Sequence, residues 1–165
     1  MSEATRTGRG VVIVGYDGSD DAERAVAATA ALFPDARAVV VTVWRPILEA
    51  ILAVSLGPAP VISDPADADE RQRRAAEDLA RQGARRATAA GLRAEPVAVR
   101  GKGPIWEVIE EVARDHDAAV ITCGRGKEST RLELLGSVAA GLVAHASRPV
   151  LVVPSPEAAA RRRVA

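Results

Sequence analysis

Residues 11–19 read VVIVGYDGS, a short run of β-branched residues followed by a turn-forming segment. A continuous apolar run of this length predicts a strand that is buried on both faces. Beyond it, Asp20 offers a helix N-cap with Glu23 three residues later, and a stripe of small and apolar residues reaches Leu32 before Pro34. The stretch therefore predicts a strand, a loop and a helix in succession.

The same alternation is repeated along the chain. Further strand-like runs lie at residues 38–44, 94–100, 118–123 and 150–153, with helical patterns between most of them. Residues 45–68 carry four prolines and predict a long connection with one short helical turn at 48–53. Strands that alternate with helices predict an α/β fold with a parallel sheet, whose ligands bind outside the carboxyl ends of the strands.

Composition narrows the class of protein further. The chain has 165 residues, 48% of them hydrophobic and 2% aromatic, as suits a single domain with an aliphatic core. Basic and acidic residues number 22 each, so we expect neither nucleic acid nor a membrane as partner. The lone Cys123 and the absence of a secretory pattern favour the cytoplasm. We expect flexible tails at 1–9 and 155–165 around a domain at 10–154.

A glycine-bearing segment follows the fourth predicted strand. Gly126 is separated by nine residues from Gly136 and Ser137, where a helix is predicted to begin. Glycine lets a backbone approach a phosphate closely, and a helix N-terminus presents free N–H groups to an anion. Lys127 and Arg125 would add positive charge beside the phosphates, and Ser137 would add a hydroxyl donor and a helix cap. The alternative is purely structural, with Gly126 in a turn and Ser137 only capping. Neither a P-loop nor a Rossmann fingerprint fits the spacing.

Together, the VGYDGS of residues 14–19, the Gly126 to Gly136-Ser137 spacing and the RPVLVV of residues 148–153 resemble the universal stress protein family. The resemblance spans the first to the fifth strand. It implies a doubly wound five-stranded parallel sheet in the order 3-2-1-4-5, with helices on both faces. In the nucleotide-binding branch of the family, the pattern is glycine, two residues, glycine, nine residues, glycine, then serine or threonine.

The resemblance also implies a ligand and roles for particular residues. The ligand would be ATP or AMP, with Mg²⁺. Asp17 would meet the ribose, and the backbone near Val43 would face the adenine edge. The phosphates would be held by Gly126, Gly136, Ser137 and Val138, with Lys127 beside them. For Asp17 the alternative is a turn aspartate that bonds to the amides of its own loop.

The chain departs from the family pattern at its first glycine. Cys123 stands there, and Gly124 comes one residue late. A Cβ at position 123 would crowd the ribose unless the loop shifts so that Gly124 makes the close approach. The alternative interpretation of Cys123 is a small buried hydrophobic residue at a strand end. If crowding is real, Cys123→Gly should tighten ATP binding.

Two functions remain open at this point. We expect a stress-response switch that binds an adenine nucleotide and has no fast catalysis, because His116 and His145 form no recognisable catalytic or metal-binding spacing. The alternative is an interaction module of the same fold that binds no nucleotide. Under either, the resemblance implies a homodimer through Val150–Val153 and a protein partner of unknown identity.

Overall fold

The computed structural model describes residues 10–46, 65–126 and 135–155. Within them, strands and helices alternate as the sequence predicts. In chain order the elements are β1 (Val11–Gly15), α1 (Asp20–Leu32), β2 (Arg37–Trp44), α3 (Pro65–Ala89), β3 (Arg93–Arg100), α4 (Ile105–Asp115), β4 (Ala118–Gly124), α5 (Ser137–His145) and β5 (Val150–Val153).

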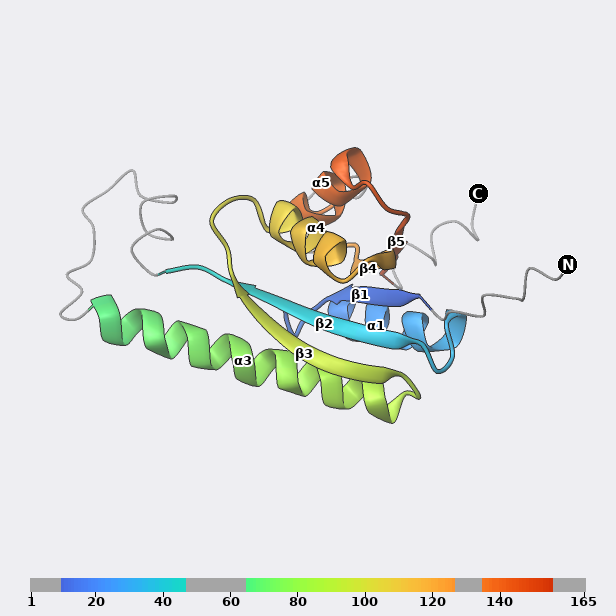
Figure 1. The fold of residues 1–165 in the computed structure, drawn as a ribbon, viewed down its shortest axis with the longest axis horizontal. Helices are drawn as coiled ribbons and strands as arrows, with labels where there is room; N and C mark the ends of the chain where they lie inside the picture. Colours follow the sequence, from blue (N-terminus) through green and yellow to red (C-terminus); the bar gives the residue numbers. More distant parts are fainter. Residues whose placement is uncertain (1–9, 47–64, 127–134, 156–165) are drawn as a thin grey trace, which may run out of the picture.

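All five strands belong to one parallel sheet in the order β3-β2-β1-β4-β5. The expected fold class and strand order are therefore confirmed. Helices α1 and α3 cover one face of the sheet, and α4 and α5 cover the other (Figure 1). Because β1 lies between β2 and β4, the loops after β1 and β4 lie side by side at the point where the strand order reverses.

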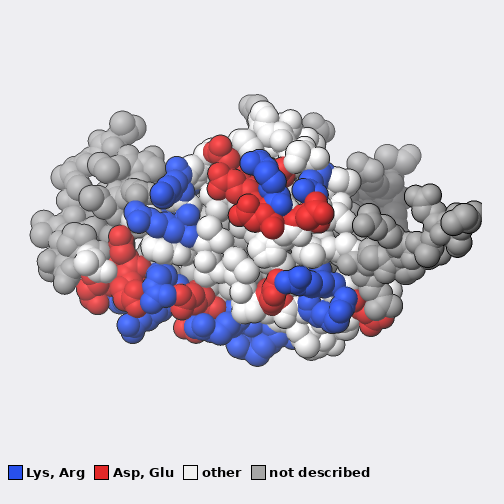
Figure 2. All heavy atoms as spheres, viewed as in Figure 1, with Lys and Arg blue, Asp and Glu red and all other residues white. Residues whose placement is uncertain are grey.

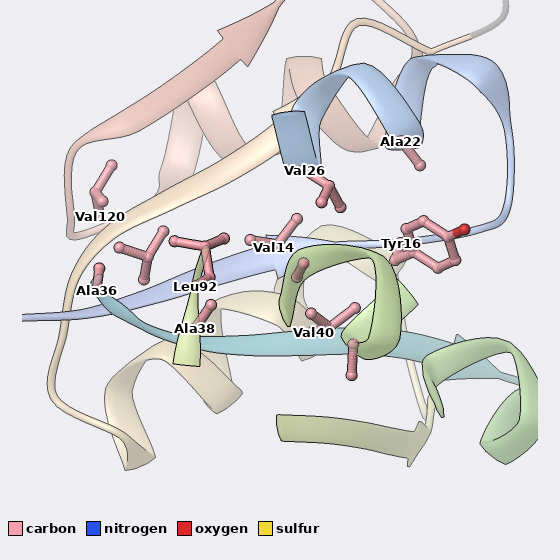
Figure 3. Close-up of a cluster of buried hydrophobic side chains, with 12 residues drawn as sticks. Val14, Tyr16, Ala22, Val26, Ala36, Ala38, Val40, Leu92 and Val120 are labelled. Carbon is pink, nitrogen blue, oxygen red and sulfur yellow. The ribbon is translucent and has the colours of Figure 1, made fainter. Parts of the chain in front are cut away.

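Burial on both faces explains the uninterrupted apolar runs in the central strands. In β1, Val12 and Val14 pack toward α1 and α3, whereas Ile13 packs toward α4 and α5. Figure 3 shows the first of these clusters, with Val14 and Val40 of the sheet beneath Val26 of α1. Small residues of α3 such as Ala84 let that helix lie close to the strands.

Helix α1 begins differently from the prediction. Its N-cap is Ser19, whose side chain accepts a hydrogen bond from the Ala22 amide, so the assignment of the cap to Asp20 was wrong. Glu23 does not close a capping box, because its carboxylate accepts a hydrogen bond from the Tyr16 hydroxyl and pairs with Arg86 of α3. At the other end of the helix, Leu32 of the predicted apolar stripe is 59% exposed.

Helix α3 is longer than predicted and shortens the connection before it. It starts at Pro65, so the last residues of the predicted 45–68 connection are helical. Gly91 follows its end at a φ of 101°, and its amide donates to the Thr88 carbonyl, as expected of a helix C-terminus. The outer face of α3 carries ion pairs such as Arg73 with Glu70, and Figure 2 shows both charges interspersed along it.

Helix α5 buries Ala139 and Leu142, whereas Val143 is 57% exposed. Three earlier expectations lie wholly or mainly outside the described residues: the tails at 1–9 and 155–165, and the helical turn at 48–53.

Candidate functional site

A cavity of about 330 Å³ lies at the carboxyl ends of β1, β2 and β4. Small-molecule sites in proteins occupy about 300–1,000 Å³, and in doubly wound sheets they lie at this switch point. Helix α4 forms one apolar wall through Ile105 and Ile109, and the first turns of α1 and α5 close the cavity on other sides. The walls comprise Gly15, Tyr16, Asp17, Ser19, Asp21, Ala22, Val41, Thr42, Val43, Leu79, Ile105, Ile109, Cys123, Gly124, Gly126, Gly136, Ser137, Val138 and Ala139.

The backbone of Val43 faces this cavity because β2 continues past the end of β1. The Tyr16 amide donates to the Val41 carbonyl over 2.9 Å, so Val41 is directed toward β1. The Gly101 amide donates to the Trp44 carbonyl over 2.8 Å, so Trp44 is directed toward β3. In a parallel sheet, successive residues of a strand direct their backbone N–H and C=O groups alternately to the two neighbouring strands. The N–H and C=O of Val43 therefore point to the side of β2 where β1 has already ended. The result is a donor and an acceptor side by side at the cavity edge.

Gly126 and Gly136 bring the two ends of the loop after β4 together. Gly126 has a φ of 87°, a conformation that favours glycine, and the Gly136 amide donates to the Arg125 carbonyl over 2.9 Å. A Cβ added at Gly136 would lie 3.1 Å from both the Arg125 carbonyl oxygen and the Gly126 Cα. The alternative in which these glycines serve only the turn of the loop therefore has direct support. It does not prevent the same glycines from also lying against a ligand.

Helix α5 begins at Ser137 with Gly136 as its N-cap, and no side chain caps it. The expectation that Ser137 caps the helix was therefore wrong. Ser137 is instead exposed and lines the cavity together with Val138. Among the described residues, no side chain caps the first amides of α5, and these amides lie at the cavity.

Cys123 and Gly124 contribute to the cavity in different ways. The Cys123 side chain is 4% exposed and packs in the cluster beneath α4, where burial raises the pKa of its thiol to about 11. A Cβ on Gly124 would lie 2.7 Å from the carbonyl carbon and oxygen of Asp21, so Gly124 makes its close approach to α1. Packing within the protein is thus sufficient to explain why a cysteine and a glycine stand at these positions, and no ligand is needed. For Cys123 this agrees with the alternative interpretation as a small buried hydrophobic residue.

Two carboxylates reach the cavity from the loop after β1 and from α1. Asp17 is exposed, and its Oδ1 accepts a hydrogen bond from the Ser19 amide over 3.0 Å, which is the local turn bond of the alternative interpretation. Asp21 accepts a hydrogen bond from the Gly126 amide over 3.0 Å through Oδ2 and pairs with Arg24 through Oδ1. Sequence reasoning missed Asp21, because nothing in the local sequence shows which loop its carboxylate will meet.

Eight of the nine residues proposed for the site line this one cavity; Lys127 lies outside the described residues. Their roles in binding remain predictions. Arg125 is not part of the described wall, which carries Asp17 and Asp21 but no Lys or Arg. No group of three or more His, Cys, Asp or Glu side chains in the described ranges is arranged to hold a metal ion. Across those same ranges, no helix combines the length and apolar character needed to span a membrane.

Comparison with known proteins gives a family-level match. The model of the universal stress protein family matches residues 9–154. A universal stress protein family structure from Burkholderia pseudomallei is 25% identical, with a TM-score of 0.66, and the match covers 92% of this chain and all of that one. The search of curated proteins gave no match.

Two of the similar structures contain nucleotides. A universal stress protein in complex with cAMP is 27% identical, with a TM-score of 0.59 and coverage of 88% of this chain and 96% of that one. The universal stress protein from Archaeoglobus fulgidus in complex with dAMP is 23% identical, with a TM-score of 0.52 and coverage of 87% and 95%.

Proposed function

The chain belongs to the universal stress protein family, and on that premise we propose that it binds an adenine nucleotide in the cavity at the carboxyl ends of β1, β2 and β4. In this proposal the protein is a cytoplasmic regulator of the stress response that changes state with its ligand and has no fast catalysis. The observation that carries the proposal is that the Val43 backbone points to the side where β1 has ended, in the same cavity as the start of α5; within the described residues, no strand pairs Val43 on that side and no side chain caps the helix.

The base end of the cavity is suited to adenine. The Val43 N–H would donate to the acceptor nitrogen of the base, and its C=O would accept from the exocyclic amino group. Guanine presents the opposite pattern on that edge, with a ring N–H and a carbonyl oxygen. The apolar side chains of Ile105 and Ile109 would contact the flat faces of the base. A relative of 27% identity that binds cAMP supports an adenine ligand here.

The phosphate end of the proposed site lies at the start of α5. Because the Gly136 amide already donates to the Arg125 carbonyl, the available amides near the cavity are those of Ser137 and Val138 in the first turn of α5, where a helix N-terminus favours an anion. Asp17 would bond to the ribose hydroxyls through the oxygen that the Ser19 amide does not use. ATP would bring Mg²⁺ with it, coordinated chiefly by phosphate oxygens.

The described histidines support a binding rather than a catalytic function. His116 follows α4, with its Nδ1 3.0 Å from the Val112 carbonyl oxygen, and His145 stacks on Trp106. Neither belongs to the cavity wall. A general base for nucleotide chemistry would have to reach the ligand, and these two side chains are engaged elsewhere.

The proposed homodimer uses the edge of β5 that no other described strand pairs. This strand ends the sheet, and its four residues, Val150–Val153, are apolar and only partly buried. The opposite edge strand, β3, carries Pro96 and the charged residues Arg93, Glu95 and Arg100, which disfavour pairing between sheets. An exposed apolar edge supports the interaction-module alternative equally well, so dimerisation does not distinguish the two functions.

Isothermal titration calorimetry with ATP and Mg²⁺, and separately with AMP and cAMP, tests nucleotide binding. A suitable blocking variant is Gly15→Ala, since the added Cβ would project beside Ile109 with its nearest contact at an ordinary 3.4 Å. By contrast, a Cβ at Gly136 would press on the loop itself and would not isolate the ligand site.

We expect saturable heat of binding in the parent protein and a clear loss of affinity in Gly15→Ala, with no loss of thermal stability. Alanine costs less backbone entropy than glycine in a strand, so the fold should not suffer. Absence of heat up to millimolar concentrations of all three nucleotides would refute the proposal and favour the interaction module.

A further inference from the structure

The Asp21 carboxylate is bound to the loop that the proposed function assigns to phosphate. Its Oδ2 accepts a hydrogen bond from the Gly126 amide over 3.0 Å, and its side chain is only 13% exposed. Gly126 is one of the glycines whose amide would otherwise be free for a phosphate oxygen. A negatively charged group of the protein thus already uses a donor of the proposed anion site.

The described wall of the cavity carries negative charge near the proposed phosphate end. Among the wall residues that the structure describes, Asp17 and Asp21 are the ionisable carboxylates, and none is a Lys or Arg. Arg24 pairs with Asp21 but is not part of the wall. Like charges a few ångströms apart repel strongly where water is partly excluded. These carboxylates therefore oppose a polyphosphate, while Arg24 offsets part of the charge of Asp21 and the start of α5 attracts anions.

We propose that Asp21 determines the phosphate selectivity of the site, an inference that rests on the proposed adenine-nucleotide function. The carboxylate disfavours ligands with several phosphate charges unless a divalent cation neutralises them. The site consequently takes adenosine and AMP in preference to metal-free ATP, and it accepts ATP as the magnesium complex.

A purely structural role for Asp21 leads to a different expectation. If the carboxylate only fixes the loop through Gly126, then removing its charge should leave unchanged or weaken the binding of AMP and ATP relative to adenosine, because the loop is the part of the site that contacts phosphate. If it repels phosphate, its charge should matter in proportion to the charge of the ligand. The ratio of the ATP and adenosine affinities therefore separates the two roles, and the absolute affinities do not.

The decisive variant is Asp21→Asn, which removes the charge and retains a side-chain oxygen for the Gly126 amide. The matched control is Asp20→Asn in the same helical turn, because Asp20 is exposed and does not belong to the cavity wall. Both variants change the net charge of the protein equally. Adenosine, AMP and ATP are titrated calorimetrically in the presence of EDTA, and ATP is titrated again with excess Mg²⁺.

With EDTA, we expect Asp21→Asn to raise the affinity for ATP about tenfold or more relative to adenosine, and Asp20→Asn to change this ratio less than about twofold. Excess Mg²⁺ should shrink the effect in Asp21→Asn. An unchanged or lowered ratio in Asp21→Asn, or an equal change in both variants, would overturn the inference.

The parent protein provides a second test that needs no variant. Its affinity in EDTA should fall from adenosine to AMP to ATP, and tighter binding of metal-free ATP than of adenosine would overturn the role of Asp21 even if Asp21→Asn failed to fold. If the parent binds none of these ligands, the proposed function itself fails. That outcome is distinct from binding without the predicted selectivity.

Discussion

Replacing Cys123 by glycine should weaken the fold and strengthen nucleotide binding. The side chain is 4% exposed and packs in the cluster that contains Ile13 and Ile109. Its removal leaves a small cavity and places a flexible glycine within β4, near the strand's end at Gly124. Cys123 lines the cavity, and in the proposed function its Cβ would crowd the ribose of the ligand.

The two effects have different sizes. Loss of the buried Cβ and Sγ should cost about 1–2 kcal/mol, and the added freedom of glycine about 0.5–1 kcal/mol more. The free energy of unfolding should therefore fall by about 1.5–3 kcal/mol, which for a domain of this size lowers Tm by about 3–12 °C. Relief of crowding at the ribose should tighten binding by about threefold to tenfold, or about 1 kcal/mol.

The assay combines urea unfolding with calorimetric titration of ATP and Mg²⁺. Cys123→Ala is the matched control, because it removes Sγ but keeps the Cβ. We expect the alanine variant to bind like the parent and the glycine variant to bind more tightly despite its lower stability. Equal or weaker binding by a folded glycine variant would refute the idea that position 123 crowds the ligand.

Three further predictions concern the rest of the fold. Burial raises the pKa of Cys123 from 9.0 to about 11, and burial with a hydrogen bond to Glu23 raises the pKa of Tyr16 from 10.0 to about 12. Since both thiol and phenol ionise first in the unfolded chain, their joint contribution to the free energy of unfolding should be constant below pH 9 and fall between pH 9 and pH 12. Cys123→Ala should remove the Cys123 part, between pH 9 and 11, and leave the Tyr16 part, between pH 10 and 12; a flat profile above pH 9 in urea titrations would contradict this. Val152→Pro should convert the proposed dimer to a monomer without unfolding it, because the Val152 N–H points away from β4, toward the outer edge of the sheet. Sedimentation velocity measures this change. If the parent is a dimer and the variant has the same sedimentation coefficient, the dimer does not form through this edge. Gly141→Ala should lower the free energy of unfolding by about 1–3 kcal/mol in the same urea assay, because its Cβ would overlap the Trp106 ring; a neutral substitution would contradict that packing.

The strands could be predicted from sequence because central strands of a parallel sheet bury both faces. The runs at 11–14, 94–100 and 118–123 each match a strand to within one residue, and Val150–Val153 matches without a shift. Helix ends were harder, since Ser19 and Asp20 are both good caps and only the geometry of the loop selects Ser19. The start of α3 at Pro65 was missed because four prolines suggested a uniform loop.

The candidate site divides along similar lines. The spacing of Gly126 and Gly136 places both in the loop after β4, and the strand order then brings them to Asp17 and Val43. The bond between Asp21 and Gly126 joins residues 105 positions apart, so no local pattern reports it. Similarly, serine is a common N-cap residue, but the N-cap of α5 is Gly136. The Ser137 hydroxyl therefore does not cap the helix.

The central claim is that an adenine ring is bound by the backbone of Val43 while its phosphate lies at the start of α5. Titrating uniformly ¹⁵N-labelled protein with AMP, and following amide signals by two-dimensional NMR, tests this most directly. The account predicts saturable shifts that are largest at Val43, Gly136 and Ser137, and much weaker shifts with GMP. No shift up to millimolar AMP, equal responses to both nucleotides, or shifts confined to residues far from this cavity would contradict it.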